Sequence, residues 1–306
     1  MAAKPIAVLL MAYGGPNNLD EVEPYLLDVR GGRPTRPELV AEIRERYALI
    51  GGKSPLKELT EAQAKGLGSA LGPDFRTYVG MRHWHPYIKE TVDRVAREGL
   101  TRILGIVMAP HFSEMSVGAY EKKLLDATEG RVETLIVRRW GDHPKFIAAV
   151  TMRVRQALTQ FRPDEKVQVL FTAHSLPERI LKNGDPYPDE LKQSAAAVAN
   201  SVGLKEWHFA FQSAGATPEP WLGPEAGETM KRLAGAGHRA FLIVPIGFVC
   251  DHVEILYDVD VVYQGLAREL GVHLERTVSL NADPSLIAVL EDLVRTSVAE
   301  RGWVQA

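Results

Sequence analysis

Two segments that lie far apart in the chain each carry a side chain that can bind a metal. Residues 171–179 (FTAHSLPER) place His174 at the end of an apolar run, and residues 247–254 (GFVCDHVE) place Glu254 at the end of another. In α/β proteins, ligands bind beyond the carboxyl ends of parallel strands, which is where we expect both side chains. One imidazole and one carboxylate are too few for a structural metal, which takes about four ligands. The pair instead suits a metal ion that is held briefly and handed on.

The two candidates differ in how well the sequence supports them. His174 directly follows a strand-like run, and its partner segment favours a functional role over a histidine that only caps a turn. Glu254 starts a predicted helix over residues 253–270, where the helix dipole alone would favour an acid. His252 would not share a helix face with Glu254, so we do not expect it to be a co-ligand. Asp258 could extend a row of carboxylates or lie on a solvated helix face.

Short apolar runs that alternate with amphipathic stretches must position these side chains. This alternation predicts an α/β fold of two similar lobes, each a four-stranded parallel sheet flanked by helices. We place the N-terminal lobe at residues 1–155 and the C-terminal lobe at residues 156–306, with the last helix (284–300) able to pack on either lobe. The predicted strands are residues 6–11, 75–80, 103–108 and 132–137 in the first half, and 167–171, 207–211, 240–246 and 272–277 in the second.

Composition limits the classes of protein and site. The 306 residues carry a net charge of −3 with a pI near 6.3, which does not favour nucleic acid as a partner. Cys250 is the single cysteine, which excludes an intrachain disulfide and a cysteine-ligated iron–sulfur cluster and indicates a reducing compartment. The sequence shows no signal-peptide pattern, and no apolar stretch approaches the ~20 residues of a membrane span. We therefore expect a cytoplasmic protein without integral membrane contact.

Familiar cofactor and hydrolase motifs are missing after the predicted strands. The first strand is followed by residues 13–16 (YGGP), which match neither a G-x-G-x-x-G pattern nor a Walker sequence. Ser175 does not lie in a G-x-S-x-G elbow. We therefore expect neither a nucleotide cofactor nor a serine nucleophile.

A second, weaker set of candidates lies in the first half of the chain. Glycine pairs beside arginines form loops with cationic tips, which can bind carboxylates through forked hydrogen bonds, although surface arginines are common. Aromatic and methionine side chains of residues 110–120 could line a flat apolar pocket or simply pack in the core. The candidates are Tyr13, Arg30, Arg46, Tyr47, Ser54 and Tyr120.

The two long segments resemble motifs of one enzyme family. Residues 172–177 (TAHSLP) resemble the histidine motif of ferrochelatases, and residues 247–258 (GFVCDHVEILYD) resemble their glutamate motif. Residues 211–215 and 220–222 are also similar to the family, so the resemblance covers nearly the whole chain. The chain is most similar to the soluble coproporphyrin III ferrochelatases of Gram-positive-type bacteria, whose pattern it matches at Tyr13 and at residues 46–47, 54–56 and 110–113.

The resemblance implies two Rossmann-like lobes that clasp a tetrapyrrole and assigns a role to each candidate. His174 and Glu254 would be the catalytic and metal-binding residues on the iron side. Tyr13 would stand on the opposite face of the macrocycle. The propionates and the porphyrin edge would be bound by Arg30, Arg46, Tyr47, Ser54 and Tyr120. The chain departs from many relatives at Val262, where a further acid is common, which puts a complete carboxylate row in doubt.

The activity implied is the insertion of ferrous iron into coproporphyrin III in haem biosynthesis, with both as substrates and no resident cofactor. The nearest alternative is a protoporphyrin IX ferrochelatase, but four propionates need more anchors, such as Arg30, Arg46 and Ser54. A cobalt or nickel chelatase would be expected to use more histidine at the metal. A non-catalytic porphyrin or haem carrier would need no proton acceptor. We expect a monomer that can hand its product to a coproheme decarboxylase.

Overall fold

The computed structural model describes residues 4–215 and 217–304, which form two compact units. Of the described residues, the N-terminal unit comprises 4–110, 114–140 and 281–304, and the C-terminal unit comprises 111–113, 141–215 and 217–280. The division falls before the helix that follows Trp140, whereas the predicted boundary at residue 155 lies within that helix. The cause is packing, because this helix, α6 (Pro144–Leu158), contacts helix and strand elements of the C-terminal unit.

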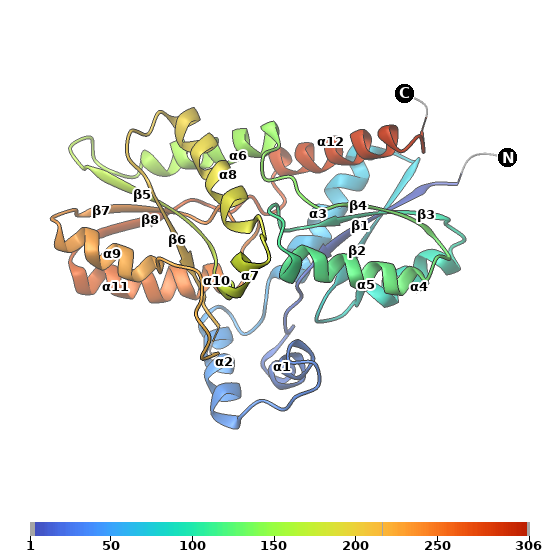
Figure 1. Cartoon of the computed structure of the whole chain (residues 1–306), viewed down its shortest axis with the longest axis horizontal. Coiled ribbons are helices and arrows are strands. Elements are labelled where there is room, and N and C mark those ends of the chain that lie inside the picture. Colours follow the sequence, from blue (N-terminus) through green and yellow to red (C-terminus); the bar gives the residue numbers. More distant parts are fainter. Residues whose placement is uncertain (1–3, 216, 305–306) are drawn as a thin grey trace. The chain divides into compact units, whose positions relative to one another are not determined.

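The N-terminal unit is built on a parallel sheet with the strand order β2-β1-β3-β4. All seven residues of β1 are buried, as expected for an inner strand covered on both faces. Helices α3 and α12 cover one face of the sheet, and α4 and α5 cover the other (Figure 1). The elements are β1 (Ile6–Ala12), β2 (Phe75–Met81), β3 (Arg102–Val107), β4 (Glu133–Val137), α3 (Leu56–Leu71), α4 (Ile88–Arg97), η2 (Glu114–Gly118), α5 (Ala119–Thr128) and α12 (Pro284–Glu300).

The last helix belongs to the N-terminal unit although it ends the chain. Helix α12 packs on α3 and reaches β4, and its fully buried side chains include Leu286, Val289 and Leu290. Their spacing of three and four residues puts them on one helix face, which explains the amphipathic pattern of this segment. Beyond the helix, the Arg102 guanidinium lies 5.6 Å from the centre of the Trp303 ring and donates to the Trp303 carbonyl oxygen at 3.1 Å.

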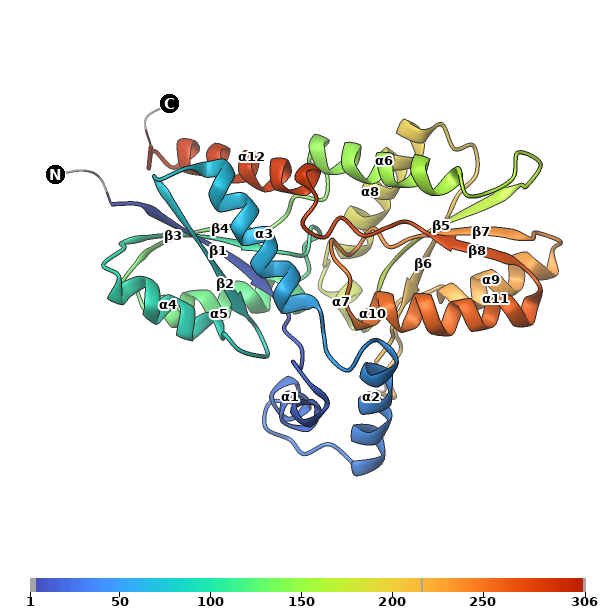
Figure 2. The ribbon, with the colours of Figure 1, turned by 180° about the vertical axis from the view of Figure 1, so that it is seen from behind.

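A pair of helices in the N-terminal unit stands away from the sheet (Figure 2). Helix α1 (Val22–Val29), after the short η1 (Leu19–Glu21), contacts α2 (Pro37–Leu49). The connection between the two helices contains Gly31 and Gly32, both with positive φ values of 63° and 83° that favour glycine. Three of the predicted anchors lie on or beside this pair.

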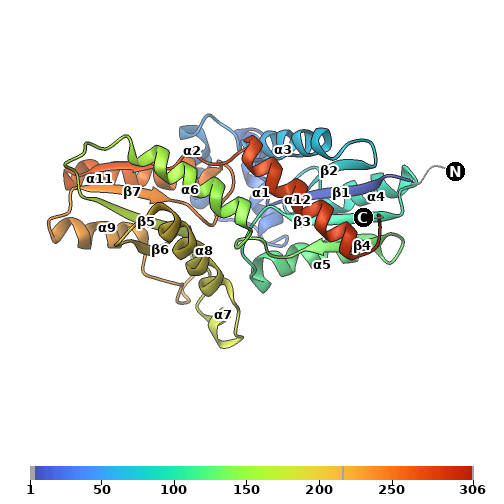
Figure 3. The same cartoon turned by 90° about the horizontal axis from the view of Figure 1, so that it is seen from above.

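The C-terminal unit repeats the same topology with the strand order β6-β5-β7-β8, again all parallel. Helices α6 and α8 cover one face of this sheet, and α9 and α11 cover the other (Figures 1 and 3). The elements are β5 (Val167–His174), α7 (Arg179–Lys182), α8 (Tyr187–Val202), β6 (His208–Gln212), α9 (Ala226–Gly235), β7 (Ala240–Val244), α10 (Val253–Leu256), η3 (Asp258–Tyr263), α11 (Gln264–Leu270) and β8 (His273–Arg276). Two parallel four-stranded sheets flanked by helices confirm the predicted fold class.

Candidate functional site

His174 is the last residue of β5, so the strand runs three residues beyond its predicted end at residue 171. The six residues before it are buried, and its own side chain is partly exposed at the carboxyl end of the strand. The Nδ1 atom makes a short hydrogen bond with the carbonyl oxygen of Ser175, which requires the proton on Nδ1. The lone pair of the neutral ring is then on Nε2, the atom available to a proton or a metal ion.

The backbone around His174 is fixed by buried hydrogen bonds. The Tyr187 hydroxyl donates to the His174 carbonyl oxygen at 3.0 Å, and burial raises the pKa of Tyr187, so this hydroxyl stays protonated. The Ser175 hydroxyl donates to the carbonyl oxygen of Leu222 at 2.8 Å and is itself buried. Ser175 therefore supports the loop and does not present a nucleophile.

Glu254 lies in a helix of only four residues, α10, and its carboxylate contacts a side chain that the helical prediction had placed on another face. The Nε2 atom of His252 lies 3.1 Å from Oε2 of Glu254. The prediction that these side chains would lie apart is wrong, because His252 is not helical. It is the N-cap residue with extended backbone angles (φ −163°, ψ −175°), which turn its side chain toward Glu254. The imidazole and the carboxylate can share a proton.

The predicted helix over residues 253–270 is three shorter pieces, because a π-helical segment, η3, separates α10 from α11. A π-turn adds a residue per turn and shifts the side chains that follow it. Asp258, the first residue of η3, accepts a short hydrogen bond from the Ser213 hydroxyl. Asp260 pairs with Arg276 through two hydrogen bonds of 2.6 and 2.8 Å. Val262 is 44% exposed on the same segment.

Gln212 lies between the backbone positions of His174 and Glu254 within the C-terminal unit. It pairs with His174 across β5 and β6 and is fully buried. Its Nε2 atom donates to the carbonyl oxygen of Glu254 at 2.7 Å. His174 and Glu254 therefore belong to one end of the sheet, joined through one buried amide. The sequence analysis did not select Gln212, although it stands at the carboxyl end of a predicted strand.

In the N-terminal unit, Tyr13 follows β1 and is 39% exposed, so its ring can touch a ligand. It packs against the ring of His83 with 4.7 Å between centroids. The Arg82 guanidinium lies 5.8 Å from the centre of the Tyr13 ring and 5.3 Å from that of Tyr120. The structure thus brings Tyr13 and Tyr120 together around one cation.

His83 and its partner Asp28 were also missed by the sequence analysis. The Nδ1 atom of His83 lies 2.8 Å from Oδ1 of Asp28. Burial, reinforced by the charges of Arg82 and Lys123, lowers the pKa of His83 to about 4 despite Asp28. His83 is therefore neutral at pH 7. The signal was available, since residues 82–85 (RHWH) follow the second predicted strand at the same sheet edge as Tyr13.

The remaining predicted anchors lie in the loops and helices before α3. Ser54 is buried, and a Cβ at Gly15 would lie 2.5 Å from the Ser54 Cβ, so the loop after β1 needs glycine there. Tyr47 is buried with its hydroxyl 3.7 Å from the same Cβ position. Arg46 pairs with Glu42 at 2.5 Å on α2. Arg30 caps the carboxyl end of α1, beside the glycine pair.

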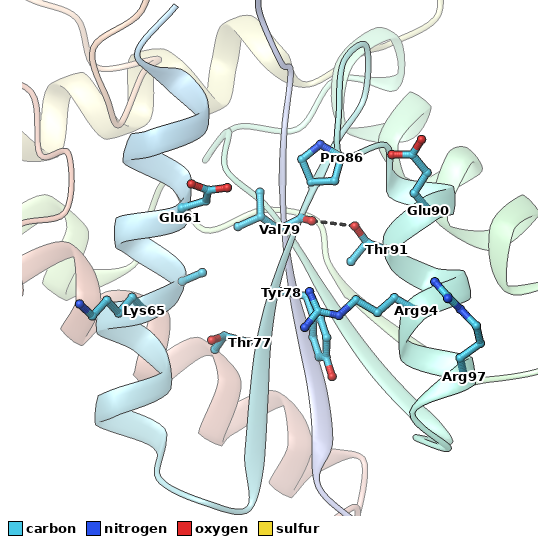
Figure 4. A pocket seen from close by; sticks show the side chains of 11 residues that line it. Glu61, Lys65, Thr77, Tyr78, Val79, Pro86, Glu90, Thr91, Arg94 and Arg97 are labelled. Carbon is cyan, nitrogen blue, oxygen red and sulfur yellow. Dashed lines mark hydrogen bonds between the residues drawn. The ribbon is translucent and has the colours of Figure 1, made fainter. Parts of the chain in front are cut away.

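One groove of the N-terminal unit contains none of the predicted residues (Figure 4). It has a volume of 480 Å³ and opens at the free edge of β2, between Glu61 and Lys65 of α3 and Arg94 and Arg97 of α4. The Thr91 hydroxyl closes part of it by donating to the Val79 carbonyl oxygen at 2.8 Å. Its acidic and basic side chains select no single ligand charge.

Neither a cluster of metal ligands nor a membrane-spanning helix is found among the described residues. Among residues 4–215 and 217–304, no group of three or more His, Cys, Asp or Glu side chains could hold a metal ion. Over the same stretches, every helix is too short or too polar to cross a membrane.

Known proteins resemble this chain along nearly its full length. A family model described as Ferrochelatase matches residues 5–298. A ferrochelatase of Herpetosiphon aurantiacus is 45% identical over 303 residues, which cover 96% of this chain and 99% of the relative. A coproporphyrin III ferrochelatase of Bacillus subtilis (strain 168) is 38% identical over 304 residues, covering 96% of this chain and 98% of the relative.

A solved structure with the same architecture is the sirohydrochlorin chelatase SirB of Bacillus subtilis subspecies spizizenii in complex with cobalt. The TM-score is 0.62 at 12% identity, and the match covers 97% of each chain. At this identity the likeness concerns the fold alone. The family model and the full-length relatives decide the assignment, and the chain belongs to the ferrochelatase family.

Proposed function

We propose that this protein inserts ferrous iron into coproporphyrin III. The observation that carries the proposal is the C-terminal sheet edge, where Gln212 links the strand that ends in His174 to the segment that holds Glu254. The carboxyl end of this sheet offers the imidazole of His174 and the carboxylate of Glu254, with the His252 imidazole beside that carboxylate. One imidazole and one carboxylate are too few ligands for a structural metal. Four pyrrole nitrogens of a porphyrin would supply the missing donors.

The reaction requires proton transfer as well as metal binding. Two pyrrole N–H protons leave the ring while Fe²⁺ loses water and binds four nitrogens, so each turnover releases two protons. In our proposal the single lone pair on Nε2 of His174 contacts the incoming iron and accepts a pyrrole proton in separate steps, and both pyrrole protons finally pass to solvent. Glu254 and His252 share a contact of 3.1 Å through which a proton can move on. Neutral imidazole is a suitable base near pH 7 and a borderline ligand for Fe²⁺.

The N-terminal unit supplies the surface that we assign to the porphyrin. Tyr13 would stand at the face of the macrocycle opposite His174 and Glu254. Arg30, Arg46, Tyr47, Ser54 and Tyr120 would bind the propionates and the ring edge. Binding energy from these remote contacts can hold the ring in a shape that favours metal insertion.

The choice of coproporphyrin over protoporphyrin rests on two observations. Relatives named coproporphyrin III ferrochelatase are 36–38% identical to this chain over nearly its full length, although three more similar relatives are named simply ferrochelatase. Arginine and hydroxyl anchors in the N-terminal unit suit a substrate with four carboxylates. Under this proposal the protein works in the cytoplasm as a monomer, needs no cofactor beyond substrate Fe²⁺ and can pass its product to a decarboxylase.

Anaerobic spectrophotometry with Fe²⁺ and either coproporphyrin III or protoporphyrin IX tests the proposal. We expect catalytic loss of the free-base porphyrin spectrum. Both kcat and kcat/KM should be higher for coproporphyrin III than for protoporphyrin IX. Preference for protoporphyrin IX would contradict the proposed substrate but agree with the proposed metal-insertion reaction. A spectral shift that stops at one equivalent without metal insertion would identify a carrier and overturn the catalytic roles of His174 and Glu254.

A further inference from the structure

Arg276 is the last residue of β8, at the carboxyl end of the C-terminal sheet, and it forms ion pairs with two carboxylates. Its guanidinium donates to both carboxylate oxygens of Asp260, at 2.6 and 2.8 Å, and lies 3.4 Å from Asp251. It also donates to the Thr277 carbonyl oxygen at 3.1 Å. Its side chain is only 18% exposed. A forked, largely buried pair of this kind is strong and geometrically specific.

The two aspartates stand on either side of Glu254 in the sequence. Asp251 lies three residues before Glu254, in the loop that leads into α10, and it also accepts from the Ser279 hydroxyl at 2.7 Å. Asp260 lies six residues after Glu254, inside the π-helical segment. One guanidinium therefore joins the beginning and the end of the segment that carries Glu254.

This segment has little regular structure of its own to hold it in place. Helix α10 has four residues, and the π-helix that follows has six. Short helices are marginal in water, and π-helices are rare outside functional sites. The segment also contains four carboxylates in ten residues, Asp251, Glu254, Asp258 and Asp260, which repel one another without a cation between them.

We propose that Arg276 is a positioning residue for the metal-insertion reaction, and this inference rests on the proposed function. It fixes the Glu254 segment by pairing with Asp251 and Asp260. In doing so it neutralises two of the four carboxylates and keeps them from competing with Glu254 for the incoming cation. Arg276 itself contacts neither the metal nor the porphyrin.

Four variants test this inference. Arg276→Gln removes the charge and the fork, and Arg276→Lys keeps the charge. Asp260→Asn removes one partner, and Arg276→Gln/Asp260→Asn removes both members of that pair. We expect Arg276→Gln to lower kcat for Fe²⁺ insertion roughly 10- to 100-fold with the KM for porphyrin unchanged. Arg276→Lys should recover part of this loss. The double variant Arg276→Gln/Asp260→Asn should be no worse than Arg276→Gln alone, because both changes break one interaction. Arg155→Gln is the matched control, since Arg155 of α6 in the same unit donates to the Ser201 carbonyl oxygen.

Hydrogen exchange gives a readout that does not depend on activity. The amides of Ile255, Tyr257 and Val261 are hydrogen-bonded to carbonyl oxygens within the segment. In Arg276→Gln they should exchange roughly tenfold faster, while those of α9 keep their rates. Unchanged exchange, or faster exchange with an unchanged kcat, would overturn the inference. A wild-type protein that inserts no metal would contradict the proposed function instead, and the exchange rates would still decide whether Arg276 holds the segment.

Discussion

The two sheets share one strand order, yet their carboxyl ends carry opposite chemistry. In the N-terminal unit, β1 is followed by Tyr13, and β2 is followed by Arg82 and His83. In the C-terminal unit, the equivalent β5 ends in His174 and β6 in Gln212. The first end is aromatic and cationic, and the second combines imidazoles with carboxylates. One topology therefore positions side chains without deciding their chemistry, which resides in the residues just past each strand.

In our assignment the C-terminal edge performs the chemistry, so its loss should have the largest effect. His174→Ala should lower kcat for iron insertion roughly 100-fold or more, because a positioned base contributes at least that much. The dissociation constant for porphyrin should change little. Anaerobic turnover and fluorescence titration measure the two quantities. His238→Ala is the control, because His238 belongs to the same unit but lies away from the carboxyl end of its sheet. A near-normal kcat for His174→Ala would contradict the catalytic role that we assign to this end of the C-terminal sheet.

The second prediction concerns the cost of a positive charge on His83, which lies at the carboxyl end of the N-terminal sheet. Burial lowers its folded-state pKa to about 4, whereas the unfolded chain has a histidine pKa of about 6.5. The unfolded state therefore binds more protons between these values, and stability falls as the pH drops through this window. When the pH is lowered from 8 to 5, protonation of His83 in the unfolded state should decrease the free energy of unfolding by about 2 kcal/mol. Urea unfolding of the wild type and His83→Gln at both pH values measures it, and parallel pH profiles would contradict the argument.

The third prediction concerns Arg30 in the N-terminal unit, which we expect to contribute to porphyrin binding and not to metal insertion. If it anchors a propionate, Arg30→Gln should raise the KM for coproporphyrin about tenfold, the loss expected for one charge-assisted hydrogen bond, with kcat unchanged. Steady-state kinetics at saturating Fe²⁺ gives both constants. Arg33→Gln is a matched control, because Arg33 is exposed and donates to the Arg30 carbonyl oxygen at 3.1 Å through its own side chain. A lowered kcat with an unchanged KM would contradict the binding role of Arg30 and indicate that it takes part in metal insertion.

The smallest effect concerns a histidine with the opposite pH response. His273 lies 3.0 Å from Glu165 and 3.1 Å from Glu275 through its two ring nitrogens. Partial burial opposes the charged form, but these hydrogen bonds raise the pKa of His273 overall. Its stabilisation is complete below the unfolded pKa and is lost as the pH rises through the folded one. His273→Gln should therefore cost a few tenths of a kcal/mol at pH 5.5 and about nothing at pH 9, because the group is over a third exposed.

The sequence was sufficient for the strands because buried inner strands such as β1 are continuous apolar runs. It also located His174, since the end of such a run marks the end of a parallel strand. The helix after Glu254 was predicted as one piece because hydrophobic periodicity does not reveal a π-turn. His252 was misjudged for the same reason, since a residue just outside a helix does not follow helical geometry. The position of His83 after the second predicted strand was a usable signal, but its pairing with Asp28 spans 55 residues and has no local sequence pattern.

The division of the chain into two units has a consequence for its synthesis. All residues of the C-terminal unit have been made once Leu280 is added, but the N-terminal unit still lacks its last segment, which begins at Asn281. Helix α12 contributes Leu286, Val289 and Leu290 to the N-terminal core, so the apolar face of α3 that contacts α12 stays uncovered until α12 has been made. The half of the protein that leaves the ribosome first is therefore the half that is completed last.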